Sequence, residues 1–225
     1  MTTIRERITH RRGRAAEEPA WRAVAARAAS LLLRYPDEGT LAVLPTVTAA
    51  LDELPAAVAR PLRSVADMRA HADPGILAAE YVQLFDFRRR CCLHLTYYTC
   101  GDTRKRGAAL VLFAAAYKTA GVEIVDRELP DYLPAVLDLA ARDDDGWRLL
   151  RENRVGLDLL AKALDAEKSA YRHVIEAVRA MLPPPQPGDV AAALRLAQSG
   201  PPVEQVGLEP FGLSRPAADD PGGLR

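Results

Sequence analysis

The chain has 225 residues, of which 49% are hydrophobic and 27% are charged. Lys plus Arg and Asp plus Glu balance at 30 each, so the sequence lacks the domain-wide basic charge typical of a nucleic-acid-binding protein. No apolar run approaches the roughly 20 residues that cross a bilayer, and we expect no stable membrane insertion. The chain has three cysteines, too few and odd in number for a disulfide framework. We therefore expect a cytoplasmic protein, because disulfide frameworks are typical of secreted ones.

The first residues are basic and include the pair Arg11-Arg12. No apolar segment or small-residue cleavage site follows this pair, which speaks against an export signal. We therefore predict a disordered basic tail over residues 1–19.

Ala and Leu predominate, and no long stretch alternates apolar and polar residues. The sequence therefore predicts an all-α fold, a single-domain bundle of about seven to nine helices over residues 20–182. Asp73-Pro74 is a strong helix start, with Asp73 as the N-cap and Pro74 at the first helical position. The expected early helices cover 20–34, 40–54, 56–71 with a bend at Pro61, and 74–85.

Residues 86–101 fit neither helical nor strand spacing and are expected to form a loop with partial helix. A long helix is expected to begin after Asp102 or Thr103 and to end at Gly121, followed by a loop over 122–130. Asp131 is predicted to cap the next helix, with Pro134 at its third position and an end near residue 142.

Residues 143–146 are expected to separate that helix from two more, over 147–165 and 167–182. The proline run that begins at Pro183 should stop the last one. The remaining segment, 183–225, is rich in Pro and Gly and is predicted to be mostly disordered, with at most one short helix over 189–198 and no part in the fold.

No glycine-rich phosphate loop, hydrolase elbow or paired-histidine zinc motif occurs in the sequence. Cys91, Cys92, His94 and Cys100, with Asp102 nearby, could form a zinc site or reactive thiols. A thiol- or metal-dependent helical enzyme or sensor is therefore an alternative reading. The clusters at 88–90 and 104–106 read as a solvated basic face, or as a contact for phosphates or an acidic partner.

Two polar-aromatic segments carry a family resemblance. The first is Glu80-x-x-x-Leu84-Phe85, and the second is Arg127-Glu-Leu-Pro-Asp-x-Leu-Pro134. With Gly101-x-x-Arg-x-Arg-Gly107, Tyr117-x-x-Ala-Gly121 and the Leu-Leu-Arg-Tyr-Pro-Asp sequence over 32–37, they resemble the NarJ-type molybdenum-cofactor assembly chaperones of respiratory nitrate reductase, within the TorD-like chaperones. The resemblance covers residues 20–182. The wider family often has His where this chain has Tyr132, which puts in doubt any role that needs an imidazole there.

The resemblance implies an all-helical protein that is not an enzyme and holds no cofactor. It would bind the N-terminal region of the apo catalytic subunit of nitrate reductase and assist insertion of the molybdenum cofactor. It would not be part of the finished enzyme. The resemblance leaves open a transient contact with the molybdenum cofactor or its delivery proteins.

Tyr81, Leu84 and Phe85 fall on one face of a helix, where they could pack in the core or line a groove. A helix-in-groove mode of recognition would use this face. Arg127, Glu128 and Asp131 would orient the loop or pair with charges of the client. The candidate peptide-binding residues are Tyr81, Leu84, Phe85, Leu110, Phe113, Tyr117, Arg127, Glu128, Leu129, Pro130, Asp131 and Tyr132.

Overall fold

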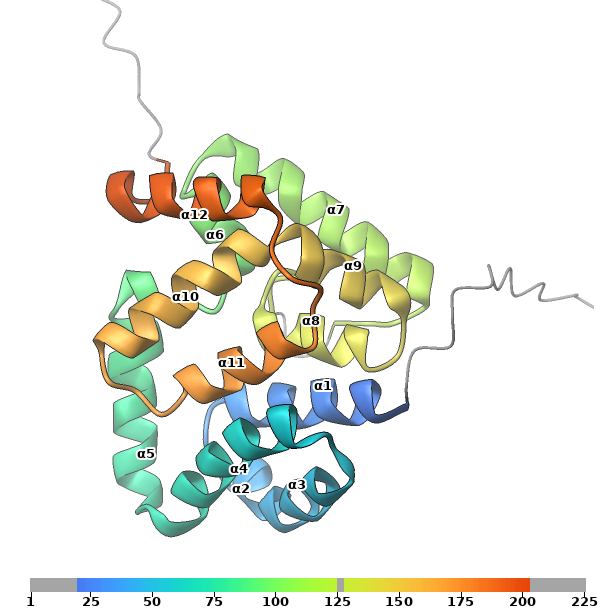
Figure 1. The fold of residues 1–225 in the computed structure, drawn as a ribbon, viewed down its shortest axis with the longest axis vertical. Helices are drawn as coiled ribbons and strands as arrows, with labels where there is room; N and C mark the ends of the chain where they lie inside the picture. Colours follow the sequence, from blue (N-terminus) through green and yellow to red (C-terminus); the bar gives the residue numbers. More distant parts are fainter. Residues whose placement is uncertain (1–19, 125–127, 203–225) are drawn as a thin grey trace, which may run out of the picture.

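The computed structural model describes residues 20–124 and 128–202. This part of the chain contains twelve α-helices and no strand (Figure 1), so the all-α prediction is confirmed and the expected number of helices is too low. Two of the additional helices arise where the sequence pattern is continuous but the backbone breaks, and another lies within residues 86–101, whose spacing fits neither helix nor strand. None of the helices is long and apolar enough to cross a membrane.

The N-terminal helices are α1 (Ala20–Leu33), α2 (Glu38–Ala42), α3 (Leu44–Ala50) and α4 (Ala56–His71). The predicted ranges of α1 and α4 are confirmed, and Pro61 lies inside α4. The helix expected over 40–54 is instead two short helices followed by a 3₁₀ turn, Leu51–Glu53. The Asp37 carboxylate accepts a hydrogen bond from Thr40 N and starts α2 at Glu38, two residues before the range we predicted.

Helix α5 (Pro74–Tyr81) begins as predicted, because the Asp73 carboxylate accepts from the backbone N–H of Gly75 and Ile76. It continues into a π-helical turn, Val82–Asp86, and then a 3₁₀ turn, Arg89–Cys91. Helix α6 (Leu95–Cys100) follows, so the expectation of a loop with partial helix is confirmed.

Helix α7 (Arg104–Ala120) starts after Thr103 and ends at Gly121, whose φ of 66° is the left-handed cap predicted from sequence. Helix α8 (Leu133–Ala140) has Tyr132 as its N-cap residue, with Pro134 at the second helical position. The prediction that Asp131 caps this helix is therefore wrong. The Asp131 carboxylate faces other elements of the fold.

The C-terminal helices are α9 (Asp144–Glu152), α10 (Arg154–Ala166), α11 (Arg172–Ala180) and α12 (Pro187–Ser199). Residues 143–146 were expected to be a separator, but Asp143 accepts from Asp145 N and starts α9. The helix expected over 147–165 is interrupted at Asn153, whose side chain donates to Leu149 O. Helix α11 begins five residues later than predicted, after a turn in which Lys168 has a φ of 54°.

The core joins the first helix to α11. Helix α1 packs against α8, α4 and α11. Ser30 Oγ donates to Pro134 O at 2.8 Å, and Arg22 donates to Met181 O at 2.8 Å across 159 residues of sequence. The buried Arg69 donates to Leu31 O and Arg34 O, which satisfies carbonyl groups at the end of α1.

Helix α12 packs against α10, at the opposite end of the molecule from α2 and α3 (Figure 1). The expected short helix is present, but the expectation that residues beyond 182 take no part in the fold is wrong. Small side chains, Ala193 above all, allow α12 to pack against α10 although it has few large apolar residues.

Candidate functional site

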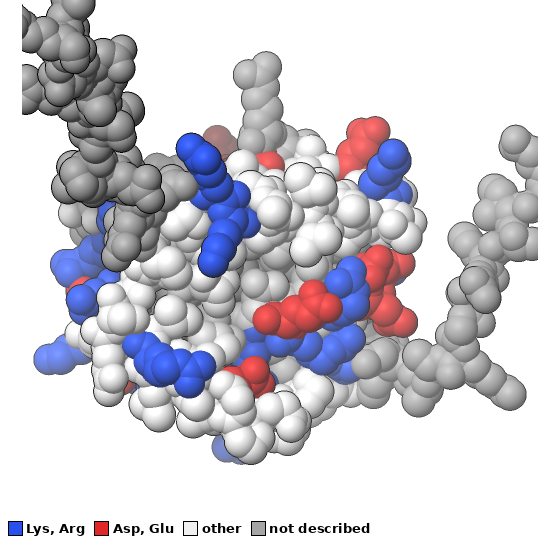
Figure 2. Space-filling view, turned by 90° about the horizontal axis from the view of Figure 1, so that it is seen from above, with Lys and Arg blue, Asp and Glu red and all other residues white. Residues whose placement is uncertain are grey.

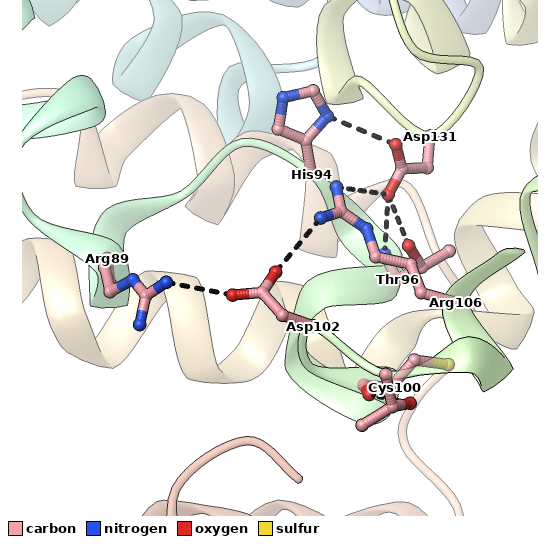
Figure 3. A network of polar contacts seen from close by, with 8 residues as sticks. Arg89, His94, Thr96, Cys100, Asp102, Arg106 and Asp131 are labelled. Atoms are coloured by element: carbon pink, nitrogen blue, oxygen red, sulfur yellow. Dashed lines mark hydrogen bonds and ion pairs between the residues drawn. The ribbon is translucent and has the colours of Figure 1, made fainter. Parts of the chain in front are cut away.

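A buried carboxylate organises the segment in front of α8. Asp131 has no solvent exposure, and its Oδ2 accepts from Thr96 N at 3.2 Å and from Thr96 Oγ1. His94 Nδ1 lies 3.1 Å from Asp131 Oδ1, and an Arg106 guanidinium nitrogen lies 3.8 Å from Oδ2 (Figure 3). Asp131 therefore ties the start of α8 to α6 and α7.

Burial alone would raise the pKa of Asp131, because it disfavours the charged form. The hydrogen bonds from His94 and Thr96 and the charges of His94 and Arg106 outweigh burial, so the pKa lies below its usual value. Asp131 is therefore a carboxylate over the whole neutral range, and its negative charge is matched by donors within the protein.

Backbone hydrogen bonds also join the segment before α6 to the segment before α8. Leu95 N donates to Asp131 O at 3.0 Å, and Leu133 N donates to Leu93 O at 2.8 Å. Together these bonds form an isolated antiparallel bridge between His94 and Tyr132, whose rings lie 5.6 Å apart between centroids. The loop before α8 is thus held at both backbone and side chain.

A second carboxylate extends this network toward the surface. Asp102 accepts from Arg89 at 2.9 Å and from Arg106 at 3.4 Å (Figure 3). Both basic clusters noted in the sequence thus contribute an arginine that contacts Asp102. Because Asp102 and Arg89 are largely exposed, the ion pair between them adds little stability and leaves Arg89 accessible.

Cys91 and Cys92 are poorly placed for thiolate chemistry. Burial, followed by the charge of Glu167, raises the pKa of Cys91 to about 11, and burial raises that of Cys92. Within residues 20–124 and 128–202, no group of three His, Cys, Asp or Glu side chains could hold a metal ion. The metal site considered from the sequence is therefore not formed by the described residues.

The candidate groove residues divide into two groups by exposure. Five of them are buried: Tyr81, Phe85, Phe113, Tyr117 and Asp131. Leu84, Leu110, Pro130 and Tyr132 are half-buried, while Glu128 and Leu129 are exposed. Arg127 lies outside the described residues. A client that approaches the folded protein can therefore touch only the second group.

The buried aromatics form the support beneath this surface. The Tyr81 ring lies 4.6 Å from that of Phe85, and its hydroxyl donates to Leu33 O and lies 3.2 Å from the Tyr132 hydroxyl. Burial, followed by the charges of Asp138 and Asp131, raises the pKa of the Tyr117 hydroxyl on α7. The structure thus places the Tyr132 hydroxyl against the aromatic cluster of Tyr81 and Phe85.

Thr96 and Tyr98 were missed from the sequence. Thr96 gives Asp131 two hydrogen bonds, and Tyr98 donates to Arg90 O and Cys92 O, which fixes the cysteine segment. Their short-range sequence context carries no periodic or motif signal. Their role appears only when residues 35 positions apart are brought together.

Comparison with known proteins gives the family. The model of the family described as nitrate reductase delta subunit matches residues 51–179, more than half of the chain. The chain belongs to this family. That match includes α4 to α10, the Asp131 network and nearly all of α11.

Two named relatives illustrate the range of the nitrate reductase delta subunit family. A protein of Bacillus subtilis named as a nitrate reductase molybdenum cofactor assembly chaperone, NarJ, is 32% identical over 158 residues, or 69% of this chain and 86% of the relative. The nitrate reductase-like protein NarX of Mycobacterium tuberculosis (strain H37Rv) is 40% identical over 160 residues, or 70% of this chain. This chain spans about a quarter of the length of NarX, 24%.

The fold is also seen in a crystal structure. A protein from Archaeoglobus fulgidus described as a redox enzyme maturation protein matches with a TM-score of 0.53 and 23% identity, covering 70% of this chain and 91% of the other. This similarity concerns the helical architecture.

Proposed function

We propose that this protein is an assembly chaperone for a respiratory nitrate reductase, with no enzymatic activity of its own. It binds the N-terminal region of the apo catalytic subunit and keeps that subunit competent for insertion of the molybdenum cofactor. The observation that carries this proposal is the similarity to the Bacillus subtilis NarJ protein over 86% of that relative's length.

The structure supports a binding role through the Asp131 network. A loop with exposed Leu129 and Glu128 is unusual in being anchored on a fully buried carboxylate and a backbone bridge. Such anchoring holds residues 129–132 in one conformation before a partner arrives, which lowers the entropy lost on binding. We propose that the client peptide lies against Leu129, Pro130 and Tyr132, with Leu84 and Leu110 as further contacts.

Isothermal titration calorimetry tests this proposal. The probe is a synthetic peptide of the first fifteen or so residues of the nitrate reductase catalytic subunit of the same organism. We expect micromolar or tighter binding by the full chain. Leu129→Glu should weaken binding by about 10-fold, or about 1.4 kcal/mol, because it removes an apolar contact and adds a charge.

Ile76→Glu is the matched control. Ile76 is a similarly exposed aliphatic residue on α5, with 59% exposure, and lies outside the proposed surface. Circular dichroism should show that both variants fold. A folded wild-type protein that ignores the peptide would refute the client assignment, and equal losses in both variants would refute the proposed surface.

A further inference from the structure

Helix α12 lies on α10 next to α6 (Figure 1). The last residue in the sequence that belongs to the main hydrophobic core is Leu182, so α12 is not part of that core. Figure 2 looks down on this end of the molecule, where uncharged residues form most of the surface. A proline-rich linker, Pro183–Gln186, connects α11 to α12. Arg154 donates to Pro183 O at 2.6 Å and so fixes the beginning of this linker to the body.

The contact between α12 and the body buries few side chains of α12. Among the described residues of α12, Ala193 alone is buried, with 4% exposure, and it lies outside the main hydrophobic cluster. Val190 and Leu194 remain 45% and 51% exposed. Within the described part of the chain, no side-chain hydrogen bond or ion pair is seen between α12 and another element. Helix α12 can therefore leave without breaking a polar contact or opening the main core.

The groove between α6 and α10, which α12 covers, is only partly filled by side chains. A cavity of about 360 Å³ lies between α6, α10 and the C-terminal end of α12. Tyr97, Leu159 and Ala163 line one side of it, and Leu196 and Ala197 line the α12 side. The cavity is open to solvent beside Ala197 and Gln198, which are exposed, so it leaves room for larger side chains than those of α12. The groove between α6 and α10 therefore accepts a helix, but one with bulkier side chains than α12 offers.

We propose that α12 is a displaceable cover of the α6–α10 groove, and that an amphipathic helix of the client takes its place. The client helix presents a large apolar side chain where α12 has Ala197, and so fills the cavity. Two cations, Arg90 and Lys162, line the cavity with one carboxylate, Glu167, which already pairs with Arg88. Acidic groups on the client helix complement the two cations. This inference rests on the proposed chaperone function. It adds a second contact surface, which α12 covers until the client displaces it.

The test uses the full chain and the N-terminal peptide of the catalytic subunit in calorimetry. Ala193→Glu places a charge in the buried contact and releases α12, while Leu194→Glu is the matched control on the solvent side. The apparent dissociation constant equals the intrinsic one divided by the fraction of open molecules. If about a tenth of the wild-type molecules are open, Ala193→Glu binds the peptide roughly 10-fold more tightly and Leu194→Glu binds as wild type.

A substitution in the opposite direction completes the design. Ala197→Leu adds apolar volume on the cavity side of α12 and should hold the cover more firmly, which weakens peptide binding several-fold. Hydrogen exchange should show that the amides of α12 lose protection when the peptide binds to wild-type protein.

Equal peptide affinity of wild type and Ala193→Glu would overturn the displaceable cover while leaving the chaperone function intact. Unchanged protection of α12 on peptide binding would overturn it as well. Absence of peptide binding by the wild type and by every variant would instead refute the client assignment, and the cover with it.

Discussion

Helices α7 and α8 flank the same loop and are both rich in apolar residues, yet they are buried very differently. Helix α8 has six buried residues in eight, including Leu133, Val136 and Leu137 with no exposure. Helix α7 is apolar from Gly107 to Tyr117, but only Phe113, Ala116 and Tyr117 are buried among its seventeen residues. Val111 and Leu112 are each 67% exposed.

The difference teaches that apolar composition does not fix the place of a helix in the fold. Helix α8 is enclosed because α1 and α9 pack against it, while α7 lies at the margin and contacts α6 and α9 with one face. A helix that is apolar all round is usually buried. The predictions below test how strongly the two helices differ.

Among truncations to alanine, the largest expected effect is loss of packing in α8. Leu137→Ala should lower the free energy of unfolding by about 2–5 kcal/mol, because it leaves a cavity in the core. Urea unfolding followed by circular dichroism measures the change. Leu112→Ala on α7 is the matched control and should change it by less than about 0.5 kcal/mol. Similar losses at the two positions would show that α7 is enclosed in solution.

The next effect concerns the crossing of α8 and α9. A Cβ at Gly146 would lie 2.2 Å from Ala140 N, so Gly146→Ala should lower the free energy of unfolding by about 1–3 kcal/mol through overpacking. Gly107 in α7 has nothing within 4 Å, and Gly107→Ala should raise stability by up to about 1 kcal/mol. Thermal unfolding of both variants tests this, and a stabilising Gly146→Ala would contradict the close crossing.

Asp131 connects the two helices through Arg106 of α7, and its removal should have an intermediate effect. Asp131→Asn should lower the free energy of unfolding by about 1–3 kcal/mol, because buried donors lose a charged acceptor. The pKa of Asp131 is lowered by folding, so its contribution is present above the unfolded value near 4 and is lost as pH falls through the lower folded value.

Urea unfolding at several pH values from 7 down to about 3 measures that contribution. The wild type should lose more stability than Asp131→Asn in the acidic part of this range. Parallel pH dependences of the two proteins would show that the Asp131 carboxylate gains nothing from the network.

The smallest effect is expected on the outer face of α7. Leu112→Lys should change the free energy of unfolding by less than about 0.5 kcal/mol, because the side chain already contacts water. Leu139→Lys in α8, a fully buried position, is the opposing variant and should prevent folding. Circular dichroism distinguishes the two results. A strongly destabilised Leu112→Lys would mean that this face is covered.

The sequence predicted well the features that depend on neighbouring residues. The cap at Asp73 and the left-handed Gly121 are formed by atoms within one helical turn, so their sequence signals suffice. Asp131 has the same local signal for a cap, but donors from Thr96 and His94 offer a better-satisfied position. Competition from residues distant in sequence is what local reasoning lacks.

The site was predicted in part for the same reason. The segments that carry the family resemblance do meet, since Tyr81 lies against Tyr132. The spacing of the candidate residues along the sequence did not distinguish buried aromatics such as Phe85 from accessible residues such as Leu129. The exposure of a residue depends on which helix packs against it. The seat of α12 was missed because its contact relies on Ala193 rather than on a large apolar stripe.

The hydrogen bond from Arg22 to Met181 has a consequence for how the protein is made. The two residues are separated by 159 positions, so α1 cannot reach its final neighbours until α11 has been synthesised. At about 5–20 residues per second, that interval is roughly 8–32 s. During this time the apolar face of α1 lacks its contact with α11, and the nascent chain is prone to aggregation. The proposed chaperone of an incomplete enzyme therefore has an incompletely packed intermediate during its own synthesis.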